Sequence, residues 1–108
     1  MSALKGFQKS YLRGIAHNRK PIVQIGKEGL VSGVIQSVND GLLRHELIKV
    51  RFISFEDKEH KEGLAAELAA KTDSMRIGMI GHTLILYKRH TDPKKRRIHV
   101  PLSACEEA

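Results

Sequence analysis

The stretch that most constrains the fold is residues 22–30, where an apolar run meets a glycine loop and then an amphipathic helical pattern. Residues 22–25 are typical of a strand, and Gly26 and Gly29 bracket Lys27 and Glu28 in a four-residue loop. Glycine has no Cβ, so this loop can turn tightly and approach a partner closely. A helix directly after it would present N–H groups and a positive dipole end to an anion. The stretch therefore predicts a strand–loop–helix unit suited to phosphate.

The charge of the chain indicates which anion to expect. Lys and Arg number 19 against 12 Asp and Glu, a net charge of +7 in 108 residues. This balance is typical of a single domain that binds a polyanion such as nucleic acid. No apolar run approaches the roughly 20 residues of a membrane span, so no membrane partner is expected. The single cysteine, Cys105, cannot form an internal disulfide and fits a reducing cytoplasm.

Hydrophobic periodicity predicts the element order α-β-α-β-α-β-β, an α+β fold in which a four-stranded mixed sheet is packed with helices. The expected helices span residues 4–17, 30–45 and 58–71, and the expected strands span residues 22–25, 47–55, 75–80 and 82–88. Residues 83–87 are apolar on both faces, which predicts an interior strand. No periodicity continues beyond Thr91. We therefore expect a domain over residues 1–90 and a flexible basic tail over residues 91–108, with a basic run at residues 94–97.

This order, with this loop, resembles the YhbY/CRM family, the chloroplast RNA splicing and ribosome maturation domain. The matching stretches are residues 11–13 (Tyr-Leu-Arg) with Ala16, His17 and Pro21, residues 23–30 (Val-Gln-Ile-Gly-Lys-Glu-Gly-Leu), residues 45–50 (His-Glu-Leu-Ile-Lys-Val) and residues 80–88 (Ile-Gly-His-Thr-Leu-Ile-Leu-Tyr-Lys). They occur in the family's order and cover about residues 4–89. Two departures are visible. Val31 stands where the family often has a small hydroxyl residue. The family's last strand usually ends in Tyr-Arg, whereas Lys88 separates Tyr87 from Arg89 in this chain.

The resemblance implies an RNA-binding module with a fold similar to the C-terminal domain of translation initiation factor three. Single-domain bacterial members are associated with precursors of the large ribosomal subunit. The basic tail lies outside the resemblance, so the resemblance implies no role for it.

The candidate RNA-binding residues share a basic character or a place in the glycine loop. They are Gly26, Lys27, Glu28 and Gly29 in the loop, Lys5, Lys9, Arg13 and His17 in a row on the first helix, Arg19 and Lys20 after it, Lys49 and Arg51 on the second strand, and Lys88 and Arg89 at the end of the last strand. For the loop, the alternative is a simple tight turn. For the row on the first helix, the alternative is a solvated helix face. We expect Glu28 to point away from RNA or to pair with a nearby Lys or Arg side chain.

Other chemistries find little support in the sequence. Six histidines are present, but none is spaced from another ligand as in a known metal site, so no metal or other cofactor is expected. No nucleophile elbow, Walker loop or zinc-protease motif indicates an enzyme. Phe7, Tyr11 and Phe52 are expected to be buried, which leaves Phe55 and Tyr87 as the candidates for base stacking. Recognition is therefore expected to depend on RNA backbone and shape.

The sequence thus predicts a monomeric, cytoplasmic, ribosome-associated protein that binds ribosomal RNA and assists large-subunit assembly, with no small-molecule substrate. A module that docks on a ribosomal protein and a splicing factor that binds intron RNA are the alternatives. A DNA-binding role is a third class, although no helix-turn-helix or zinc-finger pattern supports it.

Overall fold

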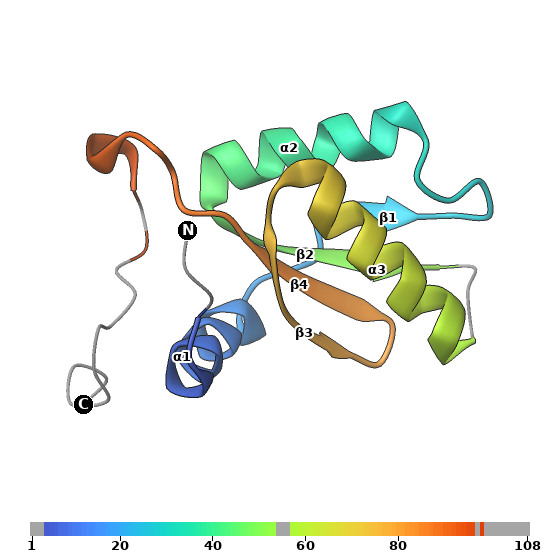
Figure 1. Cartoon of the computed structure of the whole chain (residues 1–108), viewed down its shortest axis with the longest axis horizontal. Helices are drawn as coiled ribbons and strands as arrows, with labels where there is room; N and C mark the ends of the chain where they lie inside the picture. The colour runs from blue at the N-terminus through green and yellow to red at the C-terminus, as the bar shows by residue number, and fades with distance from the viewer. Residues whose placement is uncertain (1–3, 54–56, 97, 99–108) are drawn as a thin grey trace.

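The computed structural model describes residues 4–53, 57–96 and 98 (Figure 1). Its elements are α1 (Gly6–His17), β1 (Val23–Ile25), α2 (Ser32–His45), β2 (Leu47–Phe52), α3 (Lys58–Thr72), β3 (Met75–Ile80), β4 (Thr83–Tyr87) and a short 3-10 helix, η1 (Pro93–Lys95). The predicted α+β class and the order α-β-α-β-α-β-β are confirmed. Only η1 was not foreseen.

Helices α1 and α2 each begin two residues later than predicted, α1 at Gly6 and not at residue 4, and α2 at Ser32 and not at Leu30. Gly29 has φ 71, and Val31 is extended with φ −74 and ψ 163, so the chain is not yet helical at these residues. Leu30 still packs against the main core. The apolar periodicity starts before the helix because this core contact does not require helical backbone. Strand β2 ends at Phe52, and residues 54–56 of the longer predicted strand lie outside the described residues.

The four strands form one mixed sheet in the order β1-β2-β4-β3. Strand β1 runs parallel to β2, whereas β4 pairs antiparallel with both β2 and β3. The interior position predicted for β4 is confirmed, and its residues 84–87 are all buried. An irregularity in β3 between Arg76 and Gly78 places Ile77 and Gly78 together opposite one residue of β4.

Helices cover both faces of this sheet, and each face has its own core (Figure 1). On one face, α2 and α3 pack with Val38, Leu42 and Leu68 against Val50 and Leu84. On the other, α1 packs with Leu12 and Ala16 against Leu47, Ile77 and Ile85. Alternation along β2 sends neighbouring side chains to opposite faces. Lys49 and Arg51 therefore share the α1 side with Leu47.

Helix α1 leaves part of its face of the sheet uncovered. Along β2 on this side, Leu47 is buried, Lys49 is half-buried and Arg51 is exposed. Gln24 of β1, which is the Cα partner of Arg51, is also exposed. The basic side chains of β2 thus lie on open sheet surface and not beneath a helix. The sequence alone left open which of these two arrangements would occur.

The C-terminal segment is hydrogen-bonded to the domain where the structure describes it, and the expectation of a flexible basic tail over residues 91–108 stays a prediction. The buried carboxylate of Glu46 accepts hydrogen bonds from the backbone N–H of His90 at 2.8 Å and of Ile98 at 3.0 Å. Ile98 joins the core beneath α1. This attachment depends on a long-range partner, which periodicity within the tail cannot reveal. Residues 97 and 99–108 lie outside the described residues.

Candidate nucleic-acid interface

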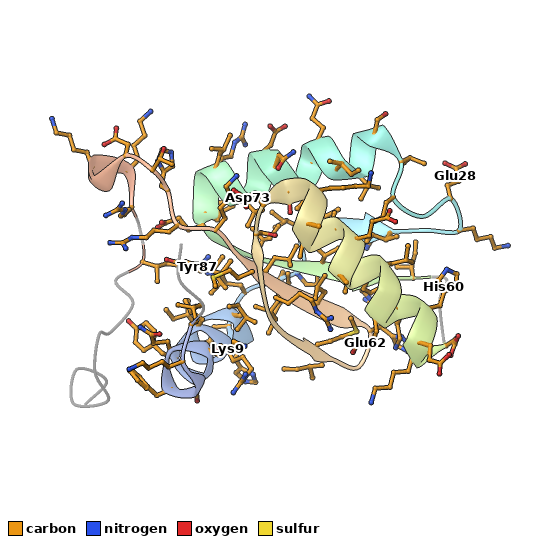
Figure 2. The ribbon with its side chains drawn as sticks, viewed as in Figure 1. Lys9, Glu28, His60, Glu62, Asp73 and Tyr87 are labelled. Carbon is orange, nitrogen blue, oxygen red and sulfur yellow. The ribbon has the colours of Figure 1, made fainter. Side chains whose placement is uncertain are left out.

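The glycine loop, residues 26–29, forms an exposed turn between β1 and α2. The N–H of Gly29 donates to the carbonyl of Gly26 at 3.0 Å, and Lys27 and Glu28 lie exposed at the tip. The positive φ of Gly29 favours glycine, whereas an ideal Cβ on Gly26 would only reach ordinary contact, 3.8 Å, with Ile53. Figure 2 shows Glu28 pointing outward from the turn. The turn thus favours glycine at position 29 through its backbone conformation, whereas position 26 has room for a Cβ.

The start of α2 is two residues further from the loop than the sequence predicted. Val31 is the N-cap, and its side chain makes no capping hydrogen bond because it has no acceptor. The departure of Val31 from the family pattern therefore has a structural consequence. Leu30 and Val31 therefore separate the loop from the positive end of α2, and phosphate binding by these two features stays a prediction.

Arg19 binds the exposed edge of β2, where β1 does not reach. Strand β1 begins only at Val23, opposite Val50, so the first residues of β2 have no strand on that side. The guanidinium of Arg19 donates to the carbonyl of Leu47 at 2.7 Å and to that of His45 at 3.5 Å. Arg19 therefore supplies donors where a paired strand would, and among the described residues it has no carboxylate partner.

Lys49 completes this attachment and extends the positive charge along β2. Its Nζ donates to the backbone carbonyl of Arg19 at 2.9 Å. Arg51 lies two residues further along the same face, about 6.6 Å away by strand geometry. Lys20 is exposed beside Arg19. We name the set Arg19, Lys20, Lys49, Arg51 and Lys27 the cationic track, because it leads from the α1–β1 connection along β2 toward the glycine loop.

The row on α1 is partly engaged with the sheet. Nη1 of Arg13 donates to the carbonyl of Ile77 at 3.3 Å, and its Cδ lies 3.4 Å from the place of a Cβ on Gly78. Lys5 and His17 are exposed, and Lys9 is half-buried on α1 (Figure 2). None of these four side chains forms a salt bridge within the described residues. The row thus adds unneutralised charge beside the uncovered sheet.

The structure separates Lys88 from this surface. Lys88 follows β4 on the same side as Leu86, and its Nζ donates to the carbonyl of Thr72 at the end of α3, 3.3 Å away. This is the side of the sheet that α2 and α3 cover. Arg89 is exposed. Strand alternation could have predicted that Lys88 and Arg89 differ, because consecutive side chains of an extended chain point to opposite sides.

Tyr87 is not available for base stacking, which corrects one of the two aromatic candidates. Its side chain is only 1% exposed and lies in the core beneath α1. Burial raises the pKa of the Tyr87 phenol above its ordinary value of 10.0, and the carboxylate of Glu46 raises it further, while Arg89 and Arg96 act in the opposite direction. Phe55 lies outside the described residues. The predicted burial of Phe52 is confirmed.

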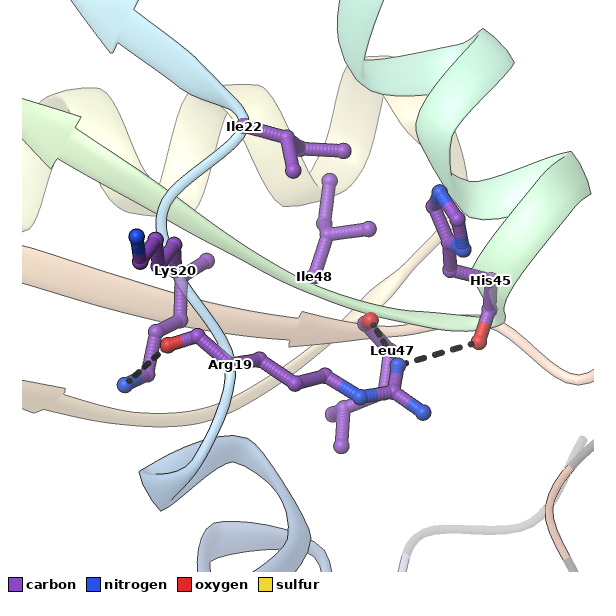
Figure 3. A pocket seen from close by; sticks show the side chains of 7 residues that line it. Arg19, Lys20, Ile22, His45, Leu47 and Ile48 are labelled. Carbon is purple, nitrogen blue, oxygen red and sulfur yellow. Dashed lines mark hydrogen bonds between the residues drawn. The ribbon is translucent and has the colours of Figure 1, made fainter.

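One feature of the site was missed in the sequence, a pocket of about 410 Å³ at the open edge of β2 (Figure 3). It is lined by Arg19, Lys20, Ile22, His45, Leu47, Ile48 and Lys49. The lining comes from the α1–β1 connection, the end of α2 and the start of β2. No periodic signal marks such a site, because it depends on where three elements end.

Acidic groups gather on the other side of the molecule. Asp57 caps α3, since its carboxylate accepts a hydrogen bond from the N–H of Glu59 at 3.3 Å. Glu62 of α3 forms a salt bridge with Arg76 of β3. No Asp or Glu precedes Glu28 in the chain. Residues 1–27 are thus free of acidic side chains, whereas α3 carries charges of both signs.

The described part of the chain contains neither a helix that could span a membrane nor a cluster of metal-binding side chains. None of its helices has the length and apolar character needed to cross a membrane. Within residues 4–53, 57–96 and 98, no group of three or more His, Cys, Asp or Glu side chains is arranged to hold a metal ion.

In a comparison with known protein families, residues 4–88 match the CRS1 / YhbY (CRM) domain. The chain is 35% identical over 94 residues to an "RNA-binding protein" from Haemophilus influenzae, covering 87% of this chain and 94% of the relative. It is 36% identical over 92 residues to "Probable RNA-binding protein YqeI" from Bacillus subtilis, covering 85% and 95%. A solution structure of a hypothetical protein from Staphylococcus aureus matches with a TM-score of 0.75 and 36% identity, over 90% of this chain and 100% of that one.

Proposed function

The chain belongs to the CRS1 / YhbY (CRM) domain family, and on that premise we propose that it is a non-catalytic RNA-binding protein that docks on structured ribosomal RNA of the large-subunit precursor. In this proposal it assists assembly in the cytoplasm, bound to the immature ribosome. The names of its relatives support RNA as the partner. The ribosomal target rests on the family resemblance.

The observation that carries the proposal is the cationic track, Arg19, Lys20, Lys49, Arg51 and Lys27. Lys49 and Arg51 lie on the α1 side of β2, and no member of the track forms a salt bridge within the described residues. Cations without carboxylate partners attract phosphates and release the counterions that surround RNA. Arg19 and Lys49 are also held by backbone carbonyls, so they are oriented before RNA arrives.

The mechanism we propose is electrostatic docking on the RNA backbone. The glycine loop approaches phosphates with Lys27, while Lys49 and Arg51 follow the strand along open sheet. Glu28, exposed and directed away from the turn, stays in solvent. Lys88 takes no part, because its ammonium is bound at the end of α3. Since the described aromatic side chains of β2 and β4 are buried, shape and backbone dominate recognition.

The decisive experiment reverses the charge at the loop. Lys27→Asp should weaken binding to a large-subunit ribosomal RNA fragment by about tenfold or more, because one phosphate contact becomes a repulsion. Lys71→Asp on α3 is the matched control, since Lys71 is also an exposed lysine but lies on the opposite side. Fluorescence anisotropy and co-sedimentation with ribosomal precursors give the readouts. Equal affinity of folded Lys27→Asp and the parent protein would exclude the loop from the interface.

One observation favours the alternative of a protein-docking module. Ile53 and Ile80 are 55% and 63% exposed, and both lie near the uncovered sheet. Ribosome association that resists moderate salt and survives ribonuclease treatment would support protein docking. RNA docking through about five phosphates should instead fall steeply with salt, with a log–log slope of several units. Equal competition by duplex DNA would favour the DNA-binding class, and crosslinking to intron RNA would favour a splicing role.

A further inference from the structure

The pocket at the open edge of β2 combines an apolar interior with a basic rim. Ile22 and Ile48 lie next to one another in its lining, and Arg19 extends along one side toward the end of α2, where His45 lies (Figure 3). Its volume of about 410 Å³ is within the range of small-molecule sites, roughly 300–1,000 Å³. A ligand of this site must therefore pair an apolar, compact body with negative charge.

The charges around the pocket are all of one kind. Arg19, Lys20 and Lys49 contribute cations, His45 contributes an imidazole, and none of the described residues that line it carries a carboxylate. Arg19 uses one nitrogen, Nη1, on the carbonyls of Leu47 and His45, and Lys49 uses one bond on the carbonyl of Arg19. A guanidinium has five N–H donors and an ammonium has three. Both groups therefore keep donors for an anion while their positions are fixed.

The apolar part is held open by the packing of α2. Ile22 is 49% exposed, although it lies over α2. Gly41 makes this approach possible, because a Cβ there would lie 2.5 Å from Cδ1 of Ile22. Ile48 belongs to the main core, is only 2% exposed and lies beside Ile22, since both side chains approach the same point at Gly41. The exposed half of Ile22 thus forms the apolar wall of the pocket.

From these observations we propose that the pocket takes one unpaired nucleotide of the bound RNA, with its base against the exposed part of Ile22 and its phosphate on Lys20, Lys49 and Arg19. This inference rests on the proposed function and adds a subsite to it. A nucleotide matches the pocket because it joins a flat, largely apolar ring to a phosphate. Lys49 and Arg51 then lead the flanking backbone along β2, so the pocket is the starting point of the cationic track.

The subsite predicts a preference that backbone docking alone does not. A base can enter only if it is unpaired, since a duplex keeps its bases stacked inside. The protein should therefore bind a duplex with an unpaired bulge more tightly than the same duplex without one.

The test compares Ile22→Ala with Leu43→Ala on these two RNAs. Leu43 is a suitable control, since it is 60% exposed on α2 and does not line the pocket. Ile22→Ala should weaken binding of the bulged RNA by roughly three- to tenfold and leave the plain duplex unchanged, because only the base loses its wall. Leu43→Ala should change neither. Amide shifts on adding adenosine 5′-monophosphate should appear at Lys20, Ile22 and His45, and inorganic phosphate should give weaker ones.

The outcomes separate this inference from the function on which it rests. If the parent protein binds both RNAs equally, or Ile22→Ala binds the bulged RNA as the parent does, the nucleotide subsite is excluded while RNA binding stands. If the parent protein binds neither RNA, both proposals fail. If adenosine 5′-monophosphate binds tightly but bulged RNA does not displace it, the pocket is a site for free nucleotides, and the proposed subsite is wrong.

Discussion

Lys49 and Arg19 are joined by a 2.9 Å hydrogen bond from the Nζ of Lys49 to the backbone carbonyl of Arg19, while the guanidinium of Arg19 returns to β2 at the carbonyl of Leu47. The two basic residues thus attach the α1–β1 connection to a strand edge that no neighbouring strand covers. They serve stability and, in the proposed function, RNA docking. Variants at these two positions must therefore be checked for folding before any binding result is interpreted.

Arg19→Ala should lower the free energy of unfolding by about 1–2 kcal/mol, because the carbonyl of Leu47 loses its donor. Arg19→Lys should recover only part of this, since a lysine cannot reproduce the planar arrangement of donors that reaches Leu47 and His45 together. Urea unfolding followed by circular dichroism measures both. Lys20→Ala, the exposed neighbour, is the control and should stay within about 0.5 kcal/mol of the parent. A stability of Arg19→Ala equal to that of Lys20→Ala would contradict this role.

Glu46→Ala should destabilise the protein and release the C-terminal segment. The carboxylate is 1% exposed and accepts from the N–H groups of His90 and Ile98, which are left without this acceptor in the variant. We expect a loss of about 2–4 kcal/mol and faster proteolysis after Thr91. Glu46 has φ 62, a region that favours glycine. Glu46→Gly should therefore cost less than Glu46→Ala, although it removes the same carboxylate.

The order of these two variants is the critical result. If Glu46→Gly is the less stable one, the backbone conformation at this position has no part in the effect. If neither variant changes proteolysis of residues 91–98, the carboxylate does not hold the segment.

Stability should fall at alkaline pH because of Tyr87. Its pKa is raised in the folded protein, chiefly by burial and then by Glu46, above the 10.0 of an exposed phenol. Below pH 10 both states keep the proton, so the contribution is fully present and constant there. As the pH rises above 10, the unfolded chain loses the proton first, and stability declines until the folded phenol ionises.

Chemical unfolding at several pH values measures this decline, and Tyr87→Phe should remove it. Phenolate absorbance in a Tyr11→Phe background reports the titration of Tyr87 alone, since the chain has 2 tyrosines. Titration of Tyr87 at or below pH 10 in the folded protein would show that burial does not control this phenol.

Arg51→Ala should reduce the salt dependence of RNA binding by about one unit of log–log slope, because one phosphate contact is lost. The side chain is exposed on open sheet beside Gln24, so the fold should not change. Lys71→Ala on α3 is the matched control and should leave the slope unaltered. Anisotropy titrations at several salt concentrations give the slope of log affinity against log salt concentration. A parent-like slope for Arg51→Ala would place RNA away from β2.

Two helical glycines should respond differently to alanine. Gly63 of α3 has nothing within 4 Å of an added Cβ, so Gly63→Ala should raise stability by about 0.5–1 kcal/mol. At Gly41 the new Cβ would meet Ile22 at 2.5 Å, and Ile22 must move. Gly41→Ala should therefore gain less than Gly63→Ala in thermal unfolding. It should also weaken the bulged-RNA preference. An equal gain at both positions would mean that Ile22 is free to rotate away at no cost.

The order of the elements could be read from periodicity because each helix and strand buries its own regular pattern of apolar residues. The interior position of β4 followed in the same way from residues 84–87, which are apolar on both faces. The start of α2 could not be read so well. Leu30 contacts the core from extended backbone, and periodicity does not distinguish such a contact from a helical one.

The candidate site was predictable in its residue types and only partly in its geometry. The exposure of Lys27 and Arg51 agrees with the surface roles expected for them, although their contact with RNA stays a prediction. Lys88 could have been separated from Arg89 by strand alternation alone. The pocket at Ile22 and His45 had no sequence signal, because its walls come from segments that end near one another only in the folded chain.

The sequence by itself determined the α+β class, the glycine turn after β1 and the basic character of the chain, since these depend on local backbone preference, periodicity and composition. Only the tertiary structure decided that β1 stops short of the start of β2, that Arg19 and Lys49 fill this edge, and that Glu46 binds the segment beyond His90. The physical reason is that unpaired carbonyls and N–H groups must find donors and acceptors. Which partners they find depends on the three-dimensional arrangement and not on neighbours in the chain.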